Sequence, residues 1–149
     1  MSSVSVKTVQ QPWASMTSST DSRVKAARVA VLDDDPRIRT LLEDELLDLG
    51  LTPHLCGTAL DLLQLLQEHS IDLVLMDVAM PEVGGLECLI QLKQVNYQGP
   101  VVMVTAIDDD TIRQSCLQNG AREYVLKNEL FDRLTDLLNT HLQLTLTSS

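Results

Sequence analysis

Acidic, hydroxyl and ammonium side chains follow short apolar runs at four places in this chain. They are Asp33, Asp34 and Asp35 after RVAVL, Asp77 after LVLM, Thr105 after VVMV, and Lys127 after EYVL. Carboxylates held within a few ångström of one another repel unless a proton or a cation intervenes. Such a group is suited to a divalent cation and to an incoming anion such as a phosphoryl group.

Each of these residues has a purely structural explanation when it is taken alone. An Asp run before Pro36 is typical of a solvated helix N-cap, a Thr after a strand is commonly a turn hydroxyl, and a Lys near a helix start is usually solvated. Their repetition after four separate apolar runs is a coincidence that these explanations do not predict. The carboxyl ends of parallel strands form the binding crevice of open α/β sheets, so we expect the four groups to converge there.

The elements that must position these residues can be read from hydrophobic patterning. Short β-branched runs alternate with amphipathic stretches, which predicts an α/β fold: a five-stranded parallel sheet with helices on both faces. The predicted strands are Val29–Leu32, Thr52–Leu55, Leu73–Met76, Val101–Val104 and Glu123–Leu126.

Five helices are predicted between and after these strands from apolar spacing and capping residues. The first carries Ile38, Leu41, Leu42, Leu46 and Leu49 on one face and ends at Gly50. The second is capped by Thr58 to Asp61 and carries Leu62, Leu63, Leu65 and Leu66. The third opens at Gly85, the fourth spans Thr111–Asn119 and ends at Gly120, and the fifth spans Leu130–His141 with Leu134, Leu137 and Leu138 inward.

The chemistry of the converging residues favours magnesium and phosphoryl transfer. Mg²⁺ prefers oxygen ligands and typically uses one or two carboxylates plus a phosphate oxygen, so Asp33 and Asp34 are the predicted ligands, with Mn²⁺ as a possible substitute. Asp77 is the candidate nucleophile, and Lys127 and Thr105 would bind the charged phosphoryl oxygens. Zinc fits less well, because no His or Cys accompanies the cluster.

Composition narrows the class of protein further. The 149 residues are 44% hydrophobic and 21% charged, and no apolar run approaches the length of a membrane span. The net charge of -10 argues against direct nucleic-acid binding, which depends on Lys and Arg. Cys56, Cys88 and Cys116 lack metal-ligand spacing and are expected to be reduced core residues, which suits a cytoplasmic protein.

Residues 1–27 are rich in Ser and Thr and lack sustained periodicity, so we expect a disordered N-terminal tail. Trp13 within it is either a solvated residue or an anchor for a partner. The predicted domain spans residues 28–142, and residues 143–149 are expected to form a C-terminal tail.

Four segments carry a family resemblance: VLDDDPRIR, LVLMDVAMPEVGGLE, PVVMVTA and GAREYVLK. In order and spacing they resemble the signature segments of response regulator receiver domains of bacterial two-component systems. The resemblance implies a flavodoxin-like, doubly wound (βα)5 fold with Asp77 as phosphoacceptor. It also implies metal ligation by Asp33, Asp34, Asp77 and the Ala79 backbone carbonyl, and contacts from Thr105 and Lys127 to the phosphoryl group. Thr105 and Tyr124 match the positions that switch the face made by the fourth helix, fifth strand and fifth helix.

The sequence differs from many family members in two respects, which involve three positions. The family usually has Pro after its Lys across a cis bond, whereas Asn128 follows Lys127, and a trans bond is expected because cis bonds before other residues cost about 2.5–4 kcal/mol. Ala79 and Ile107 stand where relatives that shed phosphate quickly often carry amide or acidic side chains. Neither can orient an attacking water, which predicts a long-lived phosphoryl group.

The resemblance implies a phosphorylation-dependent interaction switch, apparently stand-alone, and not an enzyme beyond self-catalysed phosphoryl transfer and slow loss of phosphate. A sensor histidine kinase or a histidine phosphotransfer protein would supply the phosphoryl group, and the monomer or homodimer would bind a downstream protein. Two alternatives stay open. One is a phosphate-independent adaptor. The other is an aspartyl-phosphate phosphohydrolase in which Asp33 and Asp35 form a D-x-D pair.

Overall fold

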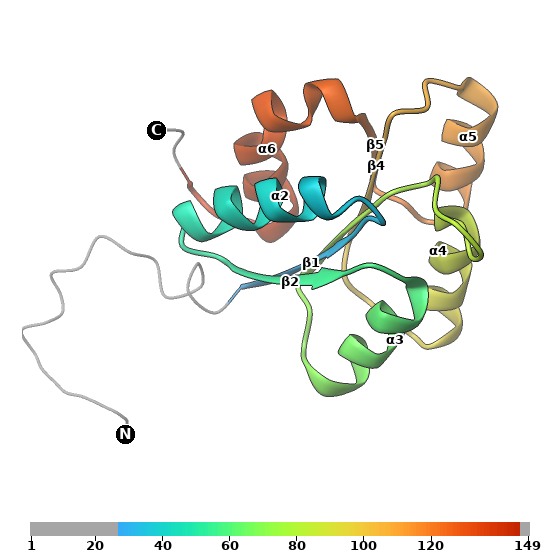
Figure 1. Ribbon diagram of the computed structural model, residues 1–149, viewed down its shortest axis with the longest axis horizontal. Helices are drawn as coiled ribbons and strands as arrows, with labels where there is room; N and C mark the ends of the chain where they lie inside the picture. The colour runs from blue at the N-terminus through green and yellow to red at the C-terminus, as the bar shows by residue number, and fades with distance from the viewer. Residues whose placement is uncertain (1–26, 147–149) are drawn as a thin grey trace, which may run out of the picture.

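The computed structural model describes residues 27–146 as five parallel strands alternating with five helices (Figure 1). In chain order they are β1 (Arg28–Leu32), α2 (Pro36–Asp48), β2 (Thr52–Cys56), α3 (Ala59–Glu68), β3 (Leu73–Met76), α4 (Gly85–Gln94), β4 (Val101–Thr105), α5 (Asp110–Gln118), β5 (Glu123–Leu126) and α6 (Lys127–Leu142). The strands form one sheet in the order β2-β1-β3-β4-β5, and every neighbouring pair is parallel. The predicted doubly wound, flavodoxin-like fold is confirmed.

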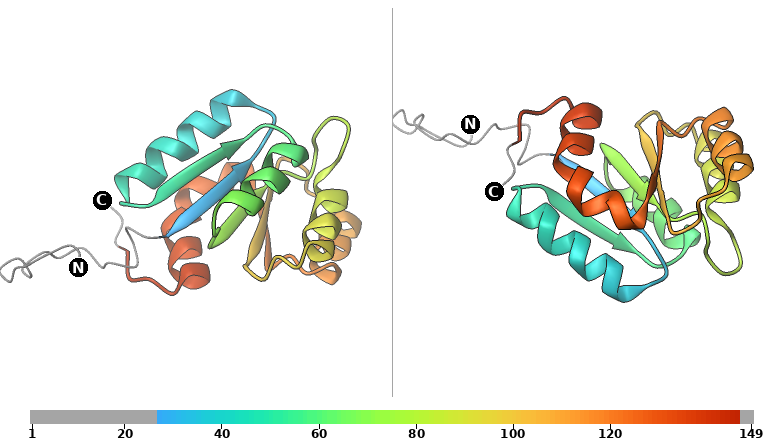
Figure 2. Two further views of the ribbon diagram at one scale, coloured as in Figure 1. Left: turned by 90° about the horizontal axis from the view of Figure 1, so that it is seen from below. Right: turned by 90° about the horizontal axis from the view of Figure 1, so that it is seen from above.

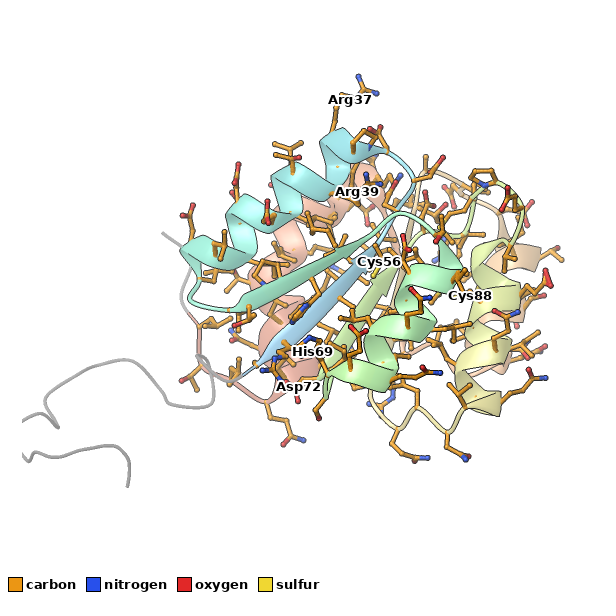
Figure 3. The ribbon with its side chains drawn as sticks, turned by 60° about the horizontal axis from the view of Figure 1, so that its bottom comes forward. Arg37, Arg39, Cys56, His69, Asp72 and Cys88 are labelled. Atoms are coloured by element: carbon orange, nitrogen blue, oxygen red, sulfur yellow. The ribbon has the colours of Figure 1, made fainter. Side chains whose placement is uncertain are left out.

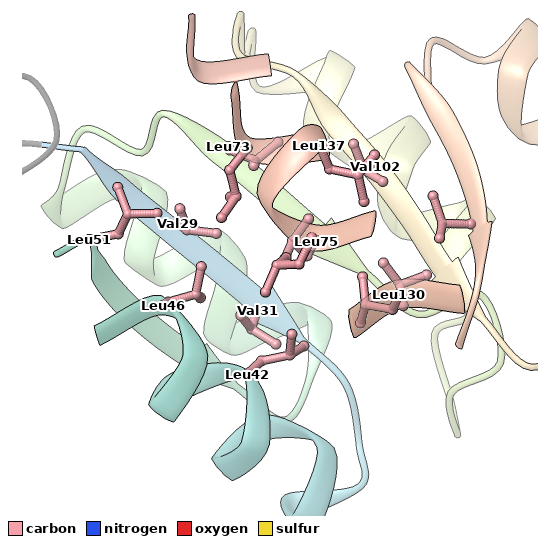
Figure 4. Packing of buried hydrophobic residues seen from close by; sticks show 14 of the residues in the cluster. Val29, Val31, Leu42, Leu46, Leu51, Leu73, Leu75, Val102, Leu130 and Leu137 are labelled. Atoms are coloured by element: carbon pink, nitrogen blue, oxygen red, sulfur yellow. The ribbon is translucent and has the colours of Figure 1, made fainter. Parts of the chain in front are cut away.

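The sheet is the middle of three layers. Helices α2 and α6 cover one face, and α3, α4 and α5 cover the other (Figures 1 and 2). Alternate strand residues point to the two faces, so Val29 and Val31 pack under α2 and α6, whereas Ala30 and Leu32 pack under the other three helices. Figure 4 shows the first of these clusters, in which Leu42 and Leu46 of α2 lie against β1.

Burial on both faces explains why β1, β3 and β4 are nearly continuous apolar runs. All four residues of β3 and all five of β4 are buried. All five strands were predicted in the right places, and three of them extend by one residue beyond the predicted bounds, at Arg28, Cys56 and Thr105.

Helix caps follow the predicted residues at three places. The Thr58 hydroxyl accepts a hydrogen bond from the backbone N–H of Asp61 and so begins α3. Gly50 and Gly120 adopt φ values of 85° and 105° just after α2 and α5, in the left-handed region that glycine enters without a Cβ penalty.

Two details of the helix predictions were wrong. Leu41 is 51% exposed, because the face of α2 that meets the sheet is narrower than predicted and is centred on Leu42 and Leu46. Helix α6 begins at Lys127 and not at Leu130, because Leu126 ends β5 in an extended conformation and serves directly as the N-cap. Apolar periodicity starts only at Leu130, so it could not report the first turn.

The packed part of the chain continues past α6. Gln143 ends the helix in a left-handed conformation, and Leu144 is then buried in the cluster beneath α2 and α6. Leu146 is fixed by two hydrogen bonds to the Asn139 side chain: its N–H donates to Oδ1 at 2.6 Å, and its carbonyl accepts from Nδ2 at 2.9 Å. Residues 143–146, expected in the C-terminal tail, are therefore part of the folded unit.

The three cysteines are free and buried, as predicted. Burial raises the pKa of the Cys56 thiol to about 12 and that of Cys88 to about 11, so both are poor nucleophiles. Within residues 27–146, none of the helices has the length and apolar character needed to cross a membrane. Trp13 lies outside the described residues.

Candidate functional site

The acidic cluster lies where β1 and β3 end side by side. The N–H of Asp33 donates to the Cys56 carbonyl at 3.2 Å, and that of Asp77 donates to the Leu32 carbonyl at 2.9 Å, so both residues continue the sheet's hydrogen bonding by one step. Carboxylate oxygens of Asp33, Asp34 and Asp77 all lie within 4.8 Å of one another. Asp33 and Asp77 are buried, with 3% and 4% exposure, whereas Asp34 is exposed.

Lys127 reaches this cluster from the first turn of α6. Its Nζ lies 2.9 Å from Asp33 Oδ2 and 3.0 Å from Asp77 Oδ2. One ammonium is thus shared by two buried carboxylates, and the exposed Asp34 adds a third negative charge. The cluster retains a net negative charge even with Lys127 in place.

The electrostatics of Asp77 follow from this arrangement. Burial raises the pKa of Asp77 above its ordinary value, and the neighbouring Asp33 charge raises it further, although hydrogen bonds from Lys127 and from the Ala79 N–H oppose the shift. Burial lowers the pKa of Lys127, but its hydrogen bonds to Asp33 and Asp77 outweigh that effect and raise it overall. Lys127 is therefore charged at neutral pH.

The donor set fits a hard divalent cation. Three carboxylates meet at one point, their charge is incompletely neutralised, and one of them faces solvent, where bound waters can complete an octahedral shell. No His or Cys belongs to this group, so the oxygen-rich set suits Mg²⁺ or Mn²⁺ better than Zn²⁺.

Asp35, the third residue of the acidic run, has a different position. Its carboxylate caps α2 by accepting from the Arg37 N–H at 2.9 Å and pairs with the Arg37 guanidinium at 3.1 Å. Arg37 itself projects away from the body of the protein (Figure 3). Asp35 is thus outside the acidic cluster, which weakens the D-x-D alternative built on Asp33 and Asp35.

Thr105 and Tyr124 are connected through the backbone of Ile107. The Thr105 hydroxyl, fully buried at the end of β4, accepts from the Ile107 N–H at 3.2 Å. The Tyr124 hydroxyl, from β5, donates to the Ile107 carbonyl at 2.6 Å. The two predicted switch residues therefore contact the same residue of the loop between β4 and α5.

The loop after β3 is fixed closely to Asp77. The Ala79 N–H donates to Asp77 Oδ1 at 3.1 Å, and the Gly85 N–H donates to the Val78 carbonyl at 2.8 Å. A Cβ on Gly85 would lie 2.2 Å from the Asp77 carbonyl oxygen, so only glycine permits this approach of α4 to the strand end.

The sequence interpretation missed Arg39. This side chain, from the first turn of α2, donates through Nη1 to the Asp33 carbonyl at 2.6 Å, while Gly57 after β2 leaves room for its guanidinium (Figure 3). Arg39 supports the backbone that carries the acidic cluster. Its only sequence signal is its position one helical turn beyond Asp35.

The peptide bond between Lys127 and Asn128 is trans, as expected, since the described residues contain no cis peptide bond. The departure from the family pattern leaves Lys127 in contact with Asp33 and Asp77. The strand and helix follow each other there without an intervening loop.

Comparison with known proteins identifies the family. The model of the response regulator receiver domain matches residues 29–139. The chain belongs to this family. It is a signalling domain of the kind found in two-component systems.

Two curated relatives show how such domains are used. The chain is 29% identical to the chemotaxis protein CheY of Bacillus subtilis over 115 residues, which are 76% of this chain and 96% of CheY. It is also 29% identical to the regulatory protein AtoC of Escherichia coli over 117 residues, which are 78% of this chain but 25% of AtoC. Receiver domains thus occur both as nearly whole proteins and as parts of longer ones.

Among solved structures, the chain resembles the response regulator TrrA of Thermotoga maritima in complex with Mg²⁺ and beryllofluoride. The TM-score is 0.68 and the identity is 29%, with 76% of this chain and 97% of TrrA covered. That relative binds Mg²⁺ in a receiver fold, which agrees with the oxygen-rich donor set described above.

Proposed function

We propose that this receiver domain accepts a phosphoryl group on Asp77 in a reaction that requires Mg²⁺ or Mn²⁺. The observation that carries the proposal is the contact of one lysine ammonium with two buried carboxylates, Asp33 and Asp77, beside the exposed Asp34. This site combines a nucleophile, cation ligands and a fixed positive charge, which are the parts that phosphoryl transfer needs.

The donor in this proposal is a phosphohistidine of a sensor kinase or phosphotransfer protein. A carboxylate oxygen of Asp77 forms a bond to phosphorus while the bond from phosphorus to the histidine nitrogen breaks, and the electron pair stays on that nitrogen. Asp33 and Asp34 would hold the cation together with Asp77 and the Ala79 carbonyl. When bound, the cation would neutralise negative charge on the oxygens of the transferred phosphoryl group.

Two side chains of the site would act on the transferred group. Lys127 is already charged and held beside Asp77, so it can pair with a phosphoryl oxygen without a large rearrangement. The Thr105 hydroxyl would donate to another oxygen, and this would change its hydrogen bond with Ile107. Through Ile107, this movement would reach Tyr124 and the face formed by α5, β5 and α6, where a downstream protein would bind.

The test is intact-mass analysis of the purified full chain after incubation with acetyl phosphate and Mg²⁺. One added phosphoryl group is expected, and it should be absent in Asp77→Asn. Asp132→Asn serves as the matched control, because Asp132 is an exposed carboxylate on α6. No addition to the unsubstituted protein, together with no binding of beryllofluoride, would instead favour a phosphate-independent adaptor.

A further inference from the structure

Tyr124 is held by a second contact besides its hydrogen bond to Ile107. The Arg113 guanidinium, from α5, lies over the ring with its carbon 5.0 Å from the ring centroid. A guanidinium within about 6 Å of an aromatic centroid is attracted by the negative face of the ring. Tyr124 is therefore fixed at two points: the hydroxyl by a carbonyl and the ring by a cation.

Arg113 is itself oriented by two carboxylates at the start of α5. Its Nη2 lies 3.2 Å from Asp108 Oδ1, and its Nε lies 3.9 Å from Asp110 Oδ1. Both carboxylates are largely exposed, so these ion pairs add little stability but restrict the direction of the side chain.

The buried Nε of Arg113 has no hydrogen-bond partner among residues 27–146. Leaving a polar atom in such a place costs free energy. The ion pairs with Asp108 and Asp110 and the contact with the Tyr124 ring are the interactions that hold the guanidinium in this place.

The position of this contact connects it to the acidic cluster. The hydroxyls of Thr105 and Tyr124 bind the two sides of the Ile107 backbone, and Arg113 covers the ring of Tyr124. A side chain that controls where Tyr124 lies would also control the shape of the face formed by α5, β5 and α6.

We propose that Arg113 is a positioning residue that holds Tyr124 in its buried orientation before any phosphoryl group is accepted. The role of this orientation in partner binding rests on the proposed function. The contact between the Arg113 guanidinium and the Tyr124 ring is an observation of the structure and does not depend on that proposal. The position of Tyr124 would then depend on this cation–π contact in addition to the hydrogen bond to the Ile107 carbonyl.

The experiment uses the full chain labelled with 3-fluorotyrosine, in which only Tyr97 and Tyr124 carry fluorine. Fluorine NMR is recorded with a soluble paramagnetic chelate and without a phosphoryl donor, and the lines are assigned with Tyr124→Phe. In the unsubstituted protein the Tyr124 line should be protected from broadening. Arg113→Ala should increase the broadening of the Tyr124 line about fivefold. Loss of one such contact is expected to raise the population of molecules with an exposed Tyr124 ring by about this factor.

Arg113→Lys should give an intermediate broadening, because an ammonium keeps the charge but cannot stack on the ring while bridging two carboxylates. Arg122→Ala, which removes an exposed arginine two residues before Tyr124, should leave the line unchanged. The Tyr97 line reports the integrity of the fold in every variant, and Arg113→Met replaces Arg113→Ala if that variant does not fold.

An unchanged Tyr124 line in both Arg113→Ala and Arg113→Met would overturn the proposal. Phosphoryl acceptance is measured separately by intact mass and should be unaffected by Arg113→Ala. Failure of Asp77 to accept a phosphoryl group would sink the proposed function while leaving the fluorine result intact, so the two failures are distinguishable.

Discussion

At the scale of single residues, the site depends on one lysine shared between two buried carboxylates. Lys127 partly offsets the cost of burying Asp33 and Asp77 and supplies a charge for an incoming phosphoryl group. Because the two buried carboxylates repel each other, a nearby positive charge stabilises them, and a bound cation would add to the charge that Lys127 supplies.

Lys127→Met should slow phosphoryl acceptance from acetyl phosphate by about a hundredfold, the loss typical of removing one group that stabilises transition-state charge. The rate is measured by intact mass over time at saturating Mg²⁺. Lys93→Met, at an exposed lysine of α4, is the control and should behave as the unsubstituted protein. Equal rates for Lys127→Met and the control would show that Lys127 has no role in the transfer.

Ala79→Asn should shorten the lifetime of the phosphoryl group on Asp77. Ala79 is exposed beside the cluster, and an amide there can orient an attacking water, which the methyl group cannot. Loss of the added mass after removal of the donor measures the lifetime. Rapid loss from the unsubstituted protein would contradict the expected long lifetime.

Sequence reasoning predicted the residues whose signal is local and missed those defined by tertiary contacts. Asp33, Asp77 and Lys127, which the structure brings together, were visible because each directly follows a strand. Thr105 was visible in the same way at the end of β4, and its contact in the structure is with Ile107. Arg39 and Arg113 were not visible, because their partners lie on other elements and surface arginines are common in helices.

At the scale of elements, the strand ends are positioned by close backbone packing. Helix α4 approaches the end of β3 so closely that no side chain fits at Gly85. The sequence predicted the start of this helix but not the reason for its glycine, because the clash involves the backbone of Asp77 and Val78.

Gly85→Ala should destabilise the protein by about 3 kcal/mol, since the new methyl group would overlap the Asp77 backbone. Urea denaturation followed by circular dichroism measures the loss. Gly84→Ala is the matched control, because a Cβ there would meet the Val78 carbonyl at 3.5 Å, an ordinary contact. Similar losses for the two variants would refute a specific clash at Gly85.

A second contact between elements predicts a pH dependence. Burial would raise the pKa of Glu123, but hydrogen bonds from His141 and Arg133 outweigh it and lower the pKa below its ordinary value of 4.5. These bonds join β5 to α6, with His141 Nε2 at 2.6 Å and Arg133 Nη2 at 2.8 Å from Glu123.

A carboxyl group whose pKa is lowered by folding stabilises the folded protein at pH values above its ordinary pKa. This stabilisation is lost as pH falls through the lowered pKa. Glu123→Gln should therefore lower the free energy of unfolding by about 1 kcal/mol at neutral pH. The difference from the unsubstituted protein should shrink as pH falls below 4.5, the ordinary carboxyl pKa, and close once pH has fallen through the lowered pKa of Glu123. Thermal unfolding across this range is the measurement, and a difference independent of pH would count against the ionic origin.

At the scale of the whole molecule, patterning predicted the three layers but not the end of the folded unit. Strand and helix periodicity placed every element, because both faces of the sheet are buried. Periodicity could not assign residues 143–146 to the folded unit, because a single buried leucine after a left-handed turn does not form a repeating pattern.

Leu144→Ala should cost about 2–3 kcal/mol in the free energy of unfolding, as expected for truncating a buried leucine. Leu47→Ala, at a leucine of α2 that is 54% exposed, should have little effect. Urea denaturation of both variants makes the comparison. A cost for Leu144→Ala no greater than for Leu47→Ala would mean that these last residues do not support the fold.

Ala27 lies at the amino end of β1, and α6 runs back from the carboxyl ends of the strands toward Leu144. The two residues belong to one buried cluster, and both lie away from the strand ends that carry Asp33 and Asp77. Chain ends that lie close together permit circular permutation. A short glycine linker joining the ends of the folded unit would free the chain to be reopened elsewhere, for example in the turn between α3 and β3. Such a permutant would keep the acidic cluster and its lysine intact while moving both ends of the chain to a new surface, where a reporter could be attached.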